Sequence, residues 1–251
     1  MWTAVAHLAL AILFLIGLFV DQRLILGINT WIKPLKFAVS IAIYLVTIAL
    51  FISYLPENGK TLQWVSIVVS ATMIIEILAI AMQALRSTTS HFNVSTPFDG
   101  AVFTLMGIAI TINTLMAGVV LFNYFTHPPE MTPSYLWGIR LGLVVFILGS
   151  VQGFQMASRL SHTVGAADGG PGLPVLNWST QYGDLRIAHF IGLHGLQIIP
   201  LIGYLSSGGN DPEKCTTLSM VWTIGAAVGT IAMMLWALLN AMSARPLIRL
   251  S

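Results

Sequence analysis

Charged residues are scarce in this chain of 251 residues, of which only 8 % are Asp, Glu, Lys or Arg. Soluble domains usually contain about 25 %. With a net charge of +2 and no run of Lys or Arg, the chain lacks the basic patch that nucleic-acid backbones require. The composition therefore excludes an ordinary soluble domain and argues against a nucleic-acid partner.

Cysteine is almost absent as well, because Cys215 is the only one and no internal disulfide can form. The metal motifs HExxH and CxxC are missing, and so are a glycine-rich phosphate loop and a Gly-x-Ser-x-Gly turn. The last apolar stretch has no lysine, which excludes a retinal Schiff base there. No internal repeat relates the first three stretches to the last three, which argues against transporters built by duplication.

Seven apolar stretches occupy most of the chain instead, and 56 % of its residues are hydrophobic. A helix needs roughly 20 apolar residues to cross about 30 Å of hydrocarbon. Lipid offers no partner to exposed backbone groups, so each stretch should be helical. We expect an all-α, single-domain, multi-pass protein of the cell's inner (plasma) membrane. Its predicted spans are residues 3–20, 35–54, 63–85, 101–125, 135–157, 185–206 and 218–242.

The distribution of Lys and Arg predicts the orientation of the chain, because cytoplasmic loops are enriched in both. One set of span ends carries Arg23, Lys33, Lys36, Arg86, Arg159, Arg186, Arg245 and Arg249. The other set carries only Lys60, Arg140 and Lys214. We therefore expect the N-terminus outside the cell and the C-terminus in the cytoplasm. The long connection 159–183 then lies on the cytoplasmic side, and its apolar residues favour a loop that folds back against the bundle.

Helix starts are predicted where a capping residue precedes a proline. Residues 132–133 and 211–212 have this pattern before spans five and seven. Before span four, Thr96 is followed by proline and, at the third helical position, by Asp99, which predicts a capping box. The segment 29–36 contains Trp and two Lys and is typical of an anchor at the lipid headgroups.

Ionisable residues within a span are costly in lipid and mark function, and those of spans three and six are the candidates. In span six the polar residues fall within an arc of roughly 140°; they are Arg186, His189, His194 and Gln197. Span three contains Glu76 near its middle and Gln83 on the same face. Arg140 is a formal partner for Glu76, although topology places it near the outer surface. We predict Glu76, His194 and Arg186 as catalytic residues, and Gln83 and Gln197 as lining a substrate cavity.

Three histidines from separate connections lie at the predicted cytoplasmic boundary. They are His91, His162 and His189, and Asp99 and Asp184 lie at the same level. Three imidazoles and a carboxylate can hold a divalent metal such as Zn²⁺, and two imidazoles can hold a haem. The sequence therefore predicts a metal site made from these five residues, or a single haem bound by His91 and His189.

Three functions agree with this pattern. The first is a metal- or haem-dependent membrane enzyme that acts on a quinone or a lipid in a polar cavity open to the cytoplasm. The second is a proton-coupled transporter or channel that uses Glu76 and His194 near the middle of the membrane. The third is a structural or assembly subunit, either in a membrane complex or as a homo-oligomer. The sequence leaves all three open.

Overall fold

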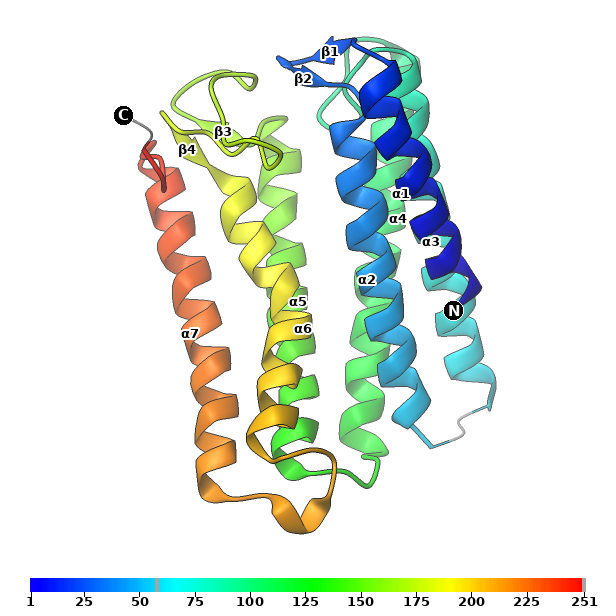
Figure 1. Ribbon diagram of the computed structural model, residues 1–251, viewed down its shortest axis with the longest axis vertical. Helices are drawn as coiled ribbons and strands as arrows, with labels where there is room; N and C mark the ends of the chain where they lie inside the picture. Colours follow the sequence, from blue (N-terminus) through cyan, green and yellow to red (C-terminus); the bar gives the residue numbers. More distant parts are fainter. Residues whose placement is uncertain (57–58, 250–251) are drawn as a thin grey trace.

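Helices make up most of the computed structural model, which describes residues 1–56 and 59–249 (Figure 1). Seven helices are long and apolar enough to cross a membrane. They are α1 (Trp2–Val20), α2 (Ile32–Tyr54), α3 (Gly59–Leu85), α4 (Pro97–Thr126), α5 (Pro133–Arg159), α6 (Leu185–Ser206) and α7 (Thr217–Met242). Each predicted span lies inside one of these helices, so the all-α fold with seven candidate spans is confirmed.

Short strands mark one end of the bundle. Strand β1 (Leu24–Ile25) pairs with β2 (Ile28–Asn29), and β3 (Thr163–Val164) pairs with β4 (Gly183–Asp184). Both hairpins lie at the same end as the last turn of α7 (Figure 1). We call this the loop end. The opposite end carries the short 3₁₀ helix η1 (Pro212–Lys214).

The start signal predicted for α7 at residues 211–212 belongs to another element, although the predicted span agrees with α7 to within one residue. The side chain of Asp211 does cap a helix, because it accepts a hydrogen bond from the N–H of Glu213, but this helix is the single turn η1. Helix α7 itself begins at Thr217, behind a capping box formed by Thr216 and Ser219. A capping residue followed by proline thus indicates that a helical turn starts, but not that the turn continues into a span.

Helices α4 and α5 each begin at the predicted proline. At α4 one half of the predicted capping box is present, because the hydroxyl of Thr96 accepts a hydrogen bond of 3.1 Å from the N–H of Asp99. The Asp99 carboxylate accepts from the Thr96 hydroxyl rather than from the Thr96 backbone. At α5 the hydroxyl of Thr132 makes no capping bond and donates to the carbonyl of Gly209 at 2.9 Å. Thr132 therefore connects two loops at the end opposite the loop end.

The helices are arranged in two groups, α1–α4 and α5–α7, that stand side by side (Figure 1).

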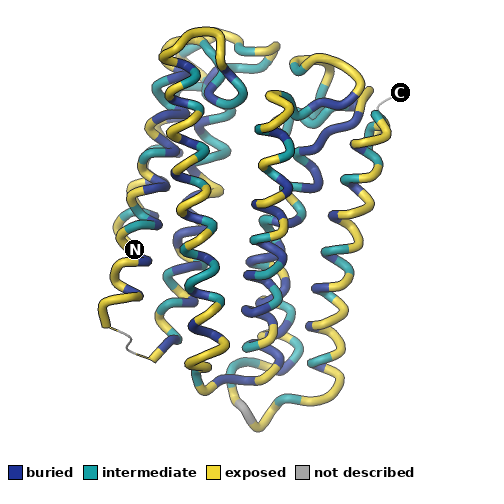
Figure 2. The backbone as a smooth tube through the Cα atoms, turned by 180° about the vertical axis from the view of Figure 1, so that it is seen from behind, coloured by how far each residue is buried: buried dark blue, intermediate teal, exposed yellow. Residues whose placement is uncertain are grey.

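Within the second group α5 and α6 approach closely, because a Cβ atom on Gly149 would lie only 2.7 Å from the backbone of Gly192. Small residues allow membrane helices to pack at short distance. Buried residues follow the facing sides of α5 and α6, whereas α7 is mostly exposed (Figure 2). The α5–α6 contact is therefore the tight centre of this group.

Trp31 connects α1 and α2 through side-chain contacts at the loop end. Its ring stacks on Phe14 at 5.7 Å between centroids, and its indole N–H donates to the Asp21 carboxylate at 2.9 Å. Arg23 holds the same carboxylate, and hydrogen bonds from Arg23 and Trp31 lower the pKa of Asp21. Trp31 is thus half-buried in a specific contact between helices, which differs from the simple headgroup anchor expected from segment 29–36.

Candidate functional site

Lys33, His91 and Glu76 lie in a row inside the α1–α4 group. The Nζ atom of Lys33 is 3.2 Å from Nδ1 of His91, and Nε2 of His91 is 3.5 Å from Oε1 of Glu76. Lys33 belongs to the first turn of α2, whereas the Glu76 side chain is 2 % exposed within α3. The Lys33–His91–Glu76 row therefore connects the loop end with a carboxyl group inside one of the candidate membrane-spanning helices.

The hydrogen bonds of the row determine where the His91 proton lies. A lysine ammonium only donates, so Nδ1 of His91 must accept from Lys33; the Ser90 hydroxyl lies 3.1 Å from the same atom. Nε2 then carries the proton and points toward Glu76. Burial, together with the charges of Lys33 and His189, lowers the pKa of His91 well below its usual range. The ring is therefore neutral at pH 7.

The second carboxyl oxygen of Glu76 is the open end of the row. Among the described residues, Oε2 of Glu76 is buried and has no hydrogen-bond partner. A buried acceptor without a donor costs about 1–3 kcal/mol. Arg140 does not supply one, because its guanidinium donates to the backbone carbonyl of Tyr124 at 2.6 Å. Oε2 is thus placed to receive a proton or a donor group from a bound molecule.

The loop between α3 and α4 carries His91 inward to Glu76. The side chain of Asn93 donates to the carbonyl of Thr89 at 3.0 Å and accepts from the backbone of Ser95 at 3.1 Å, which folds the loop tightly. Aromatic rings surround the imidazole; they belong to Phe37, Phe92 and Phe103, with centroids 5.5–6.5 Å away. These rings lower the polarity around the half-buried imidazole, which strengthens the electrostatic interactions within the row.

Asp99 lies in a separate network that ties the end of α3 to the start of α4. Its carboxylate accepts hydrogen bonds from Gln83 at 2.9 Å, from Arg86 at 2.5 Å and from the Thr96 hydroxyl at 2.6 Å. Gln83 is completely buried by these neighbours. The network therefore fixes the two ends of the loop that carries His91.

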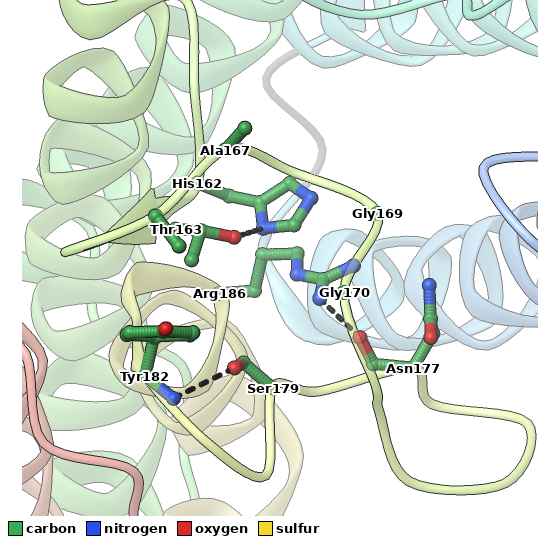
Figure 3. A pocket seen from close by; sticks show the side chains of 10 residues that line it. His162, Thr163, Ala167, Gly169, Gly170, Asn177, Ser179, Tyr182 and Arg186 are labelled. Atoms are coloured by element: carbon green, nitrogen blue, oxygen red, sulfur yellow. Dashed lines mark hydrogen bonds between the residues drawn. The ribbon is translucent and has the colours of Figure 1, made fainter.

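A second polar cluster lies beneath the connection between α5 and α6, residues 160–184, which we call the long loop. Arg186 donates to the Asp184 carboxylate through Nε at 3.0 Å and through Nη2 at 2.6 Å. Nδ1 of His162 is 3.4 Å from Asp168 and 3.8 Å from Asp184. His162 and Arg186 line a pocket of about 30 Å³ (Figure 3). This volume is enough for one or two water molecules.

The long loop folds over the loop end, as expected from its apolar residues. Lys36 of α2 donates to the carbonyls of Val175 at 2.8 Å and Leu176 at 3.2 Å. Arg186 of α6 donates to the next carbonyl, that of Asn177 (Figure 3). The backbone carbonyls of residues 175–177 therefore accept hydrogen bonds from a cationic side chain of each helix group.

The remaining polar residues of α6 are distributed along its length. His189 donates from Nδ1 to the carbonyl of Gly149 at 2.8 Å, and a Cβ atom on Gly153 would lie 2.8 Å from its ring. His194 packs against Phe190 with 4.1 Å between ring centroids. Further along, Gln197 donates to the hydroxyl of Thr47 on α2 at 3.3 Å. This last bond crosses between the two helix groups, whereas His189 is held within the α5–α7 group.

The five predicted metal ligands are not gathered at one point. His91 faces Glu76 and His162 faces Asp184, while Asp99 belongs to its own network. In residues 1–56 and 59–249, no group of three or more His, Cys, Asp or Glu is arranged to hold a metal ion. Lys33 is the site residue that sequence reasoning missed, because a lysine at the start of a span is typical of a headgroup anchor.

The chain was also compared with known proteins. No family model, no curated protein and no solved structure matches it. Its function is therefore inferred from the row and from the cluster beneath the long loop.

Acid should loosen the long loop, because His162 is held neutral there. Burial and then Arg186 lower its pKa from 6.5 to about 4, against the opposite effects of Asp184 and Asp168; Lys33 adds a smaller lowering. Between these two values the unfolded loop binds more protons than the folded loop, so stability falls as the pH falls through this window. At 1.36 kcal/mol per pKa unit, the loss approaches about 3 kcal/mol.

This pH dependence is measured by hydrogen exchange of residues 160–184, corrected for intrinsic rates, between pH 7 and pH 4. Protection should fall in the wild type and should change much less in His162→Gln. His127→Gln serves as the matched control, because His127 is exposed at the opposite end of α4. An identical pH profile in the wild type and in His162→Gln would show that His162 does not govern the loop.

Proposed function

We propose that this protein is a proton-coupled membrane carrier in which the Lys33–His91–Glu76 row moves protons between the loop end and the interior of the bundle. The observation that carries the proposal is the half-buried imidazole placed between an ammonium group and a buried carboxylate. Ionisable groups within membrane spans are typical of proton relays. Among the hypotheses from sequence this is the transporter, with His91 in the position expected for His194.

One transfer along the row balances as follows. The Lys33 ammonium gives a proton to Nδ1 of His91, and the proton on Nε2 passes to Oε1 of Glu76. Lys33 becomes a neutral amine, Glu76 a neutral acid, and His91 exchanges one neutral tautomer for the other. The separation of 3.5 Å between His91 and Glu76 exceeds the usual hydrogen-bond length, so a small inward movement of the ring must precede the second transfer.

Two further features support a proton carrier. Oε2 of Glu76 is left without a partner among the described residues, so a proton on this carboxyl can be passed to an acceptor beyond the row. Lys33 stands at the loop end, which the Lys and Arg distribution assigns to the cytoplasm, and it can be reprotonated from there. A metal-dependent enzyme finds no comparable support, since the described residues gather no group of three or more His, Cys, Asp or Glu.

The proposal is tested with purified protein in proteoliposomes that contain a pH-sensitive dye and an imposed potassium diffusion potential. Wild-type vesicles should change their internal pH faster than protein-free vesicles. Glu76→Gln keeps the size of the side chain but cannot ionise, and His91→Gln cannot pass on a proton. Both should reduce the proton flux by at least about tenfold, as expected when a general acid–base group is lost.

The matched controls are Glu130→Gln and His127→Gln, which remove the same groups at exposed positions. Their flux should equal that of the wild type. Wild-type vesicles that are no faster than protein-free vesicles would refute the proposal, and so would full flux in Glu76→Gln. Circular dichroism and elution as a single species would show that each variant is folded before its flux is compared.

A further inference from the structure

The facing sides of α2 and α6 form a seam between the two helix groups. At 100° per residue, each side is a narrow stripe, formed by Lys36, Ile43 and Thr47 on α2 and by Arg186, Phe190 and Gln197 on α6. The hydrogen bond of 3.3 Å between the half-buried side chains of Gln197 and Thr47 joins the stripes further from the loop end. At the loop end, Lys36 and Arg186 both bind the backbone of residues 175–177.

Between these two connections the seam is apolar and open. Ile43 is 44 % exposed and Phe190 is 40 % exposed, although both lie between the points at which α2 and α6 are joined. Trp178 of the long loop packs edge-on against Phe190 at 5.3 Å between centroids. Within a membrane, this strip of the seam is accessible to a hydrocarbon chain.

Positive charge is concentrated where the apolar strip meets the loop end. Lys36 and Arg186 bind neighbouring carbonyls of residues 175–177, and Lys33 lies one turn from Lys36 at the start of α2. Asp184 pairs with Arg186, but in the described part of the chain neither lysine forms an ion pair with a carboxylate, and Lys36 is held only by neutral carbonyls. A phosphate group would satisfy these cations better than backbone carbonyls do, because a bond between two charged groups is stronger.

We infer that the α2–α6 seam binds an anionic phospholipid, with its phosphate at Lys36 and Arg186 and an acyl chain along Ile43 and Phe190. This inference rests on the proposed function, since the lipid would be the molecule whose movement the proton row drives. A phospholipid fits the seam better than free phosphate does, because the basic end and the apolar strip are continuous. Free phosphate would contact only the basic end.

Native mass spectrometry of the protein in a mild detergent tests this inference, with phosphatidylglycerol and phosphatidylcholine of identical acyl chains as probes. Phosphatidylglycerol should bind at least about five-fold more tightly. Lys36→Gln should remove about five-fold of that affinity, the contribution expected from one basic residue near anionic lipid. Phe190→Ala should weaken both lipids to a similar extent, because it removes a chain contact and no charge.

Lys60→Gln and Lys214→Gln are the controls, since both lysines are exposed at the opposite end and should leave affinity unchanged. Equal binding of the two lipids, or no effect of Lys36→Gln, would overturn the inference. Displacement of phosphatidylglycerol by inorganic phosphate at similar concentration would show a free-anion site, and a lipid-free dimer would show that a second copy covers the seam. Either result also overturns it.

The same preparation separates this inference from the proposed function. Glu76→Gln should bind phosphatidylglycerol normally while its proton flux is lost, because Glu76 lies in the row and not in the seam. Normal lipid binding without any wild-type proton flux would refute the carrier and keep the lipid site. Proton flux that depends on Glu76, together with unselective lipid binding, would refute the lipid site alone.

Discussion

Arg186→Ala should lower the free energy of unfolding by about 3 kcal/mol, the effect typical of removing one partner of a buried ion pair. The Asp184 side chain is completely buried and accepts hydrogen bonds from Nε and Nη2 of Arg186. Two backbone N–H groups, those of Ser179 and Arg186, remain after the substitution. They cannot neutralise the carboxylate, so the variant retains a buried negative charge without a cation.

Unfolding in mixed micelles with increasing denaturing detergent measures this effect. The double variant Arg186→Ala with Asp184→Asn should be more stable than Arg186→Ala alone, because the amide removes the uncompensated charge. Arg159→Ala is the control for loss of an arginine, since Arg159 is exposed at the end of α5. If both single arginine variants behaved alike, the Asp184–Arg186 pair would contribute nothing to the fold.

Gly149→Ala should destabilise the protein by up to about 3 kcal/mol, at the upper end of the range for overpacking a core. The added Cβ atom would lie 2.7 Å from the carbonyl carbon of Gly192, and backbone cannot move aside as a flexible side chain can. Helices α5 and α6 would have to separate. This would also disturb His189, whose ring donates to the Gly149 carbonyl.

Gly118→Ala should change the stability in the opposite direction in the same unfolding assay. Gly118 also lies inside a helix, but a Cβ atom there meets nothing within 4 Å. Alanine should therefore stabilise that variant by about 0.5–1 kcal/mol, because it restricts the unfolded chain. The sign of the effect distinguishes a packing glycine from a tolerated one. Destabilisation of equal size at both positions would contradict the close approach of α5 and α6.

Hydropathy was sufficient to predict the spans because an apolar run of fixed length has few alternatives in lipid. The ends of the helices were predicted less precisely than their existence. The helices begin up to four residues earlier than predicted, at Gly59 for α3 and Pro97 for α4, where polar residues continue the helix beyond the apolar run. The seventh span was placed to within one residue, but the cap pattern at 211–212 belongs to η1, where the proline opens only one turn.

The site was only partly predictable, for reasons of tertiary packing. Glu76 was recognisable as a costly group in lipid, and His91 as a histidine that no cap required. Their contact depends on the inward fold of residues 86–96, whose direction is fixed by neighbours such as Asn93 and Phe103. The hydrophobic periodicity of the sequence does not encode the direction in which such a loop folds. Lys33 was missed for the same reason, since its sequence position fits a headgroup anchor equally well.

The position of the row in the chain also has a consequence for biogenesis. Lys33, Glu76 and His91 all belong to the first four helices and their connections, which leave the ribosome before α5. Because domains form from the N-terminus during synthesis, the buried Glu76 meets its partners while the C-terminal helices are still unmade. The carboxyl group does not have to wait in the translocon for a distant counter-ion, and α5–α7 insert beside a helix group whose most costly side chain is already accommodated.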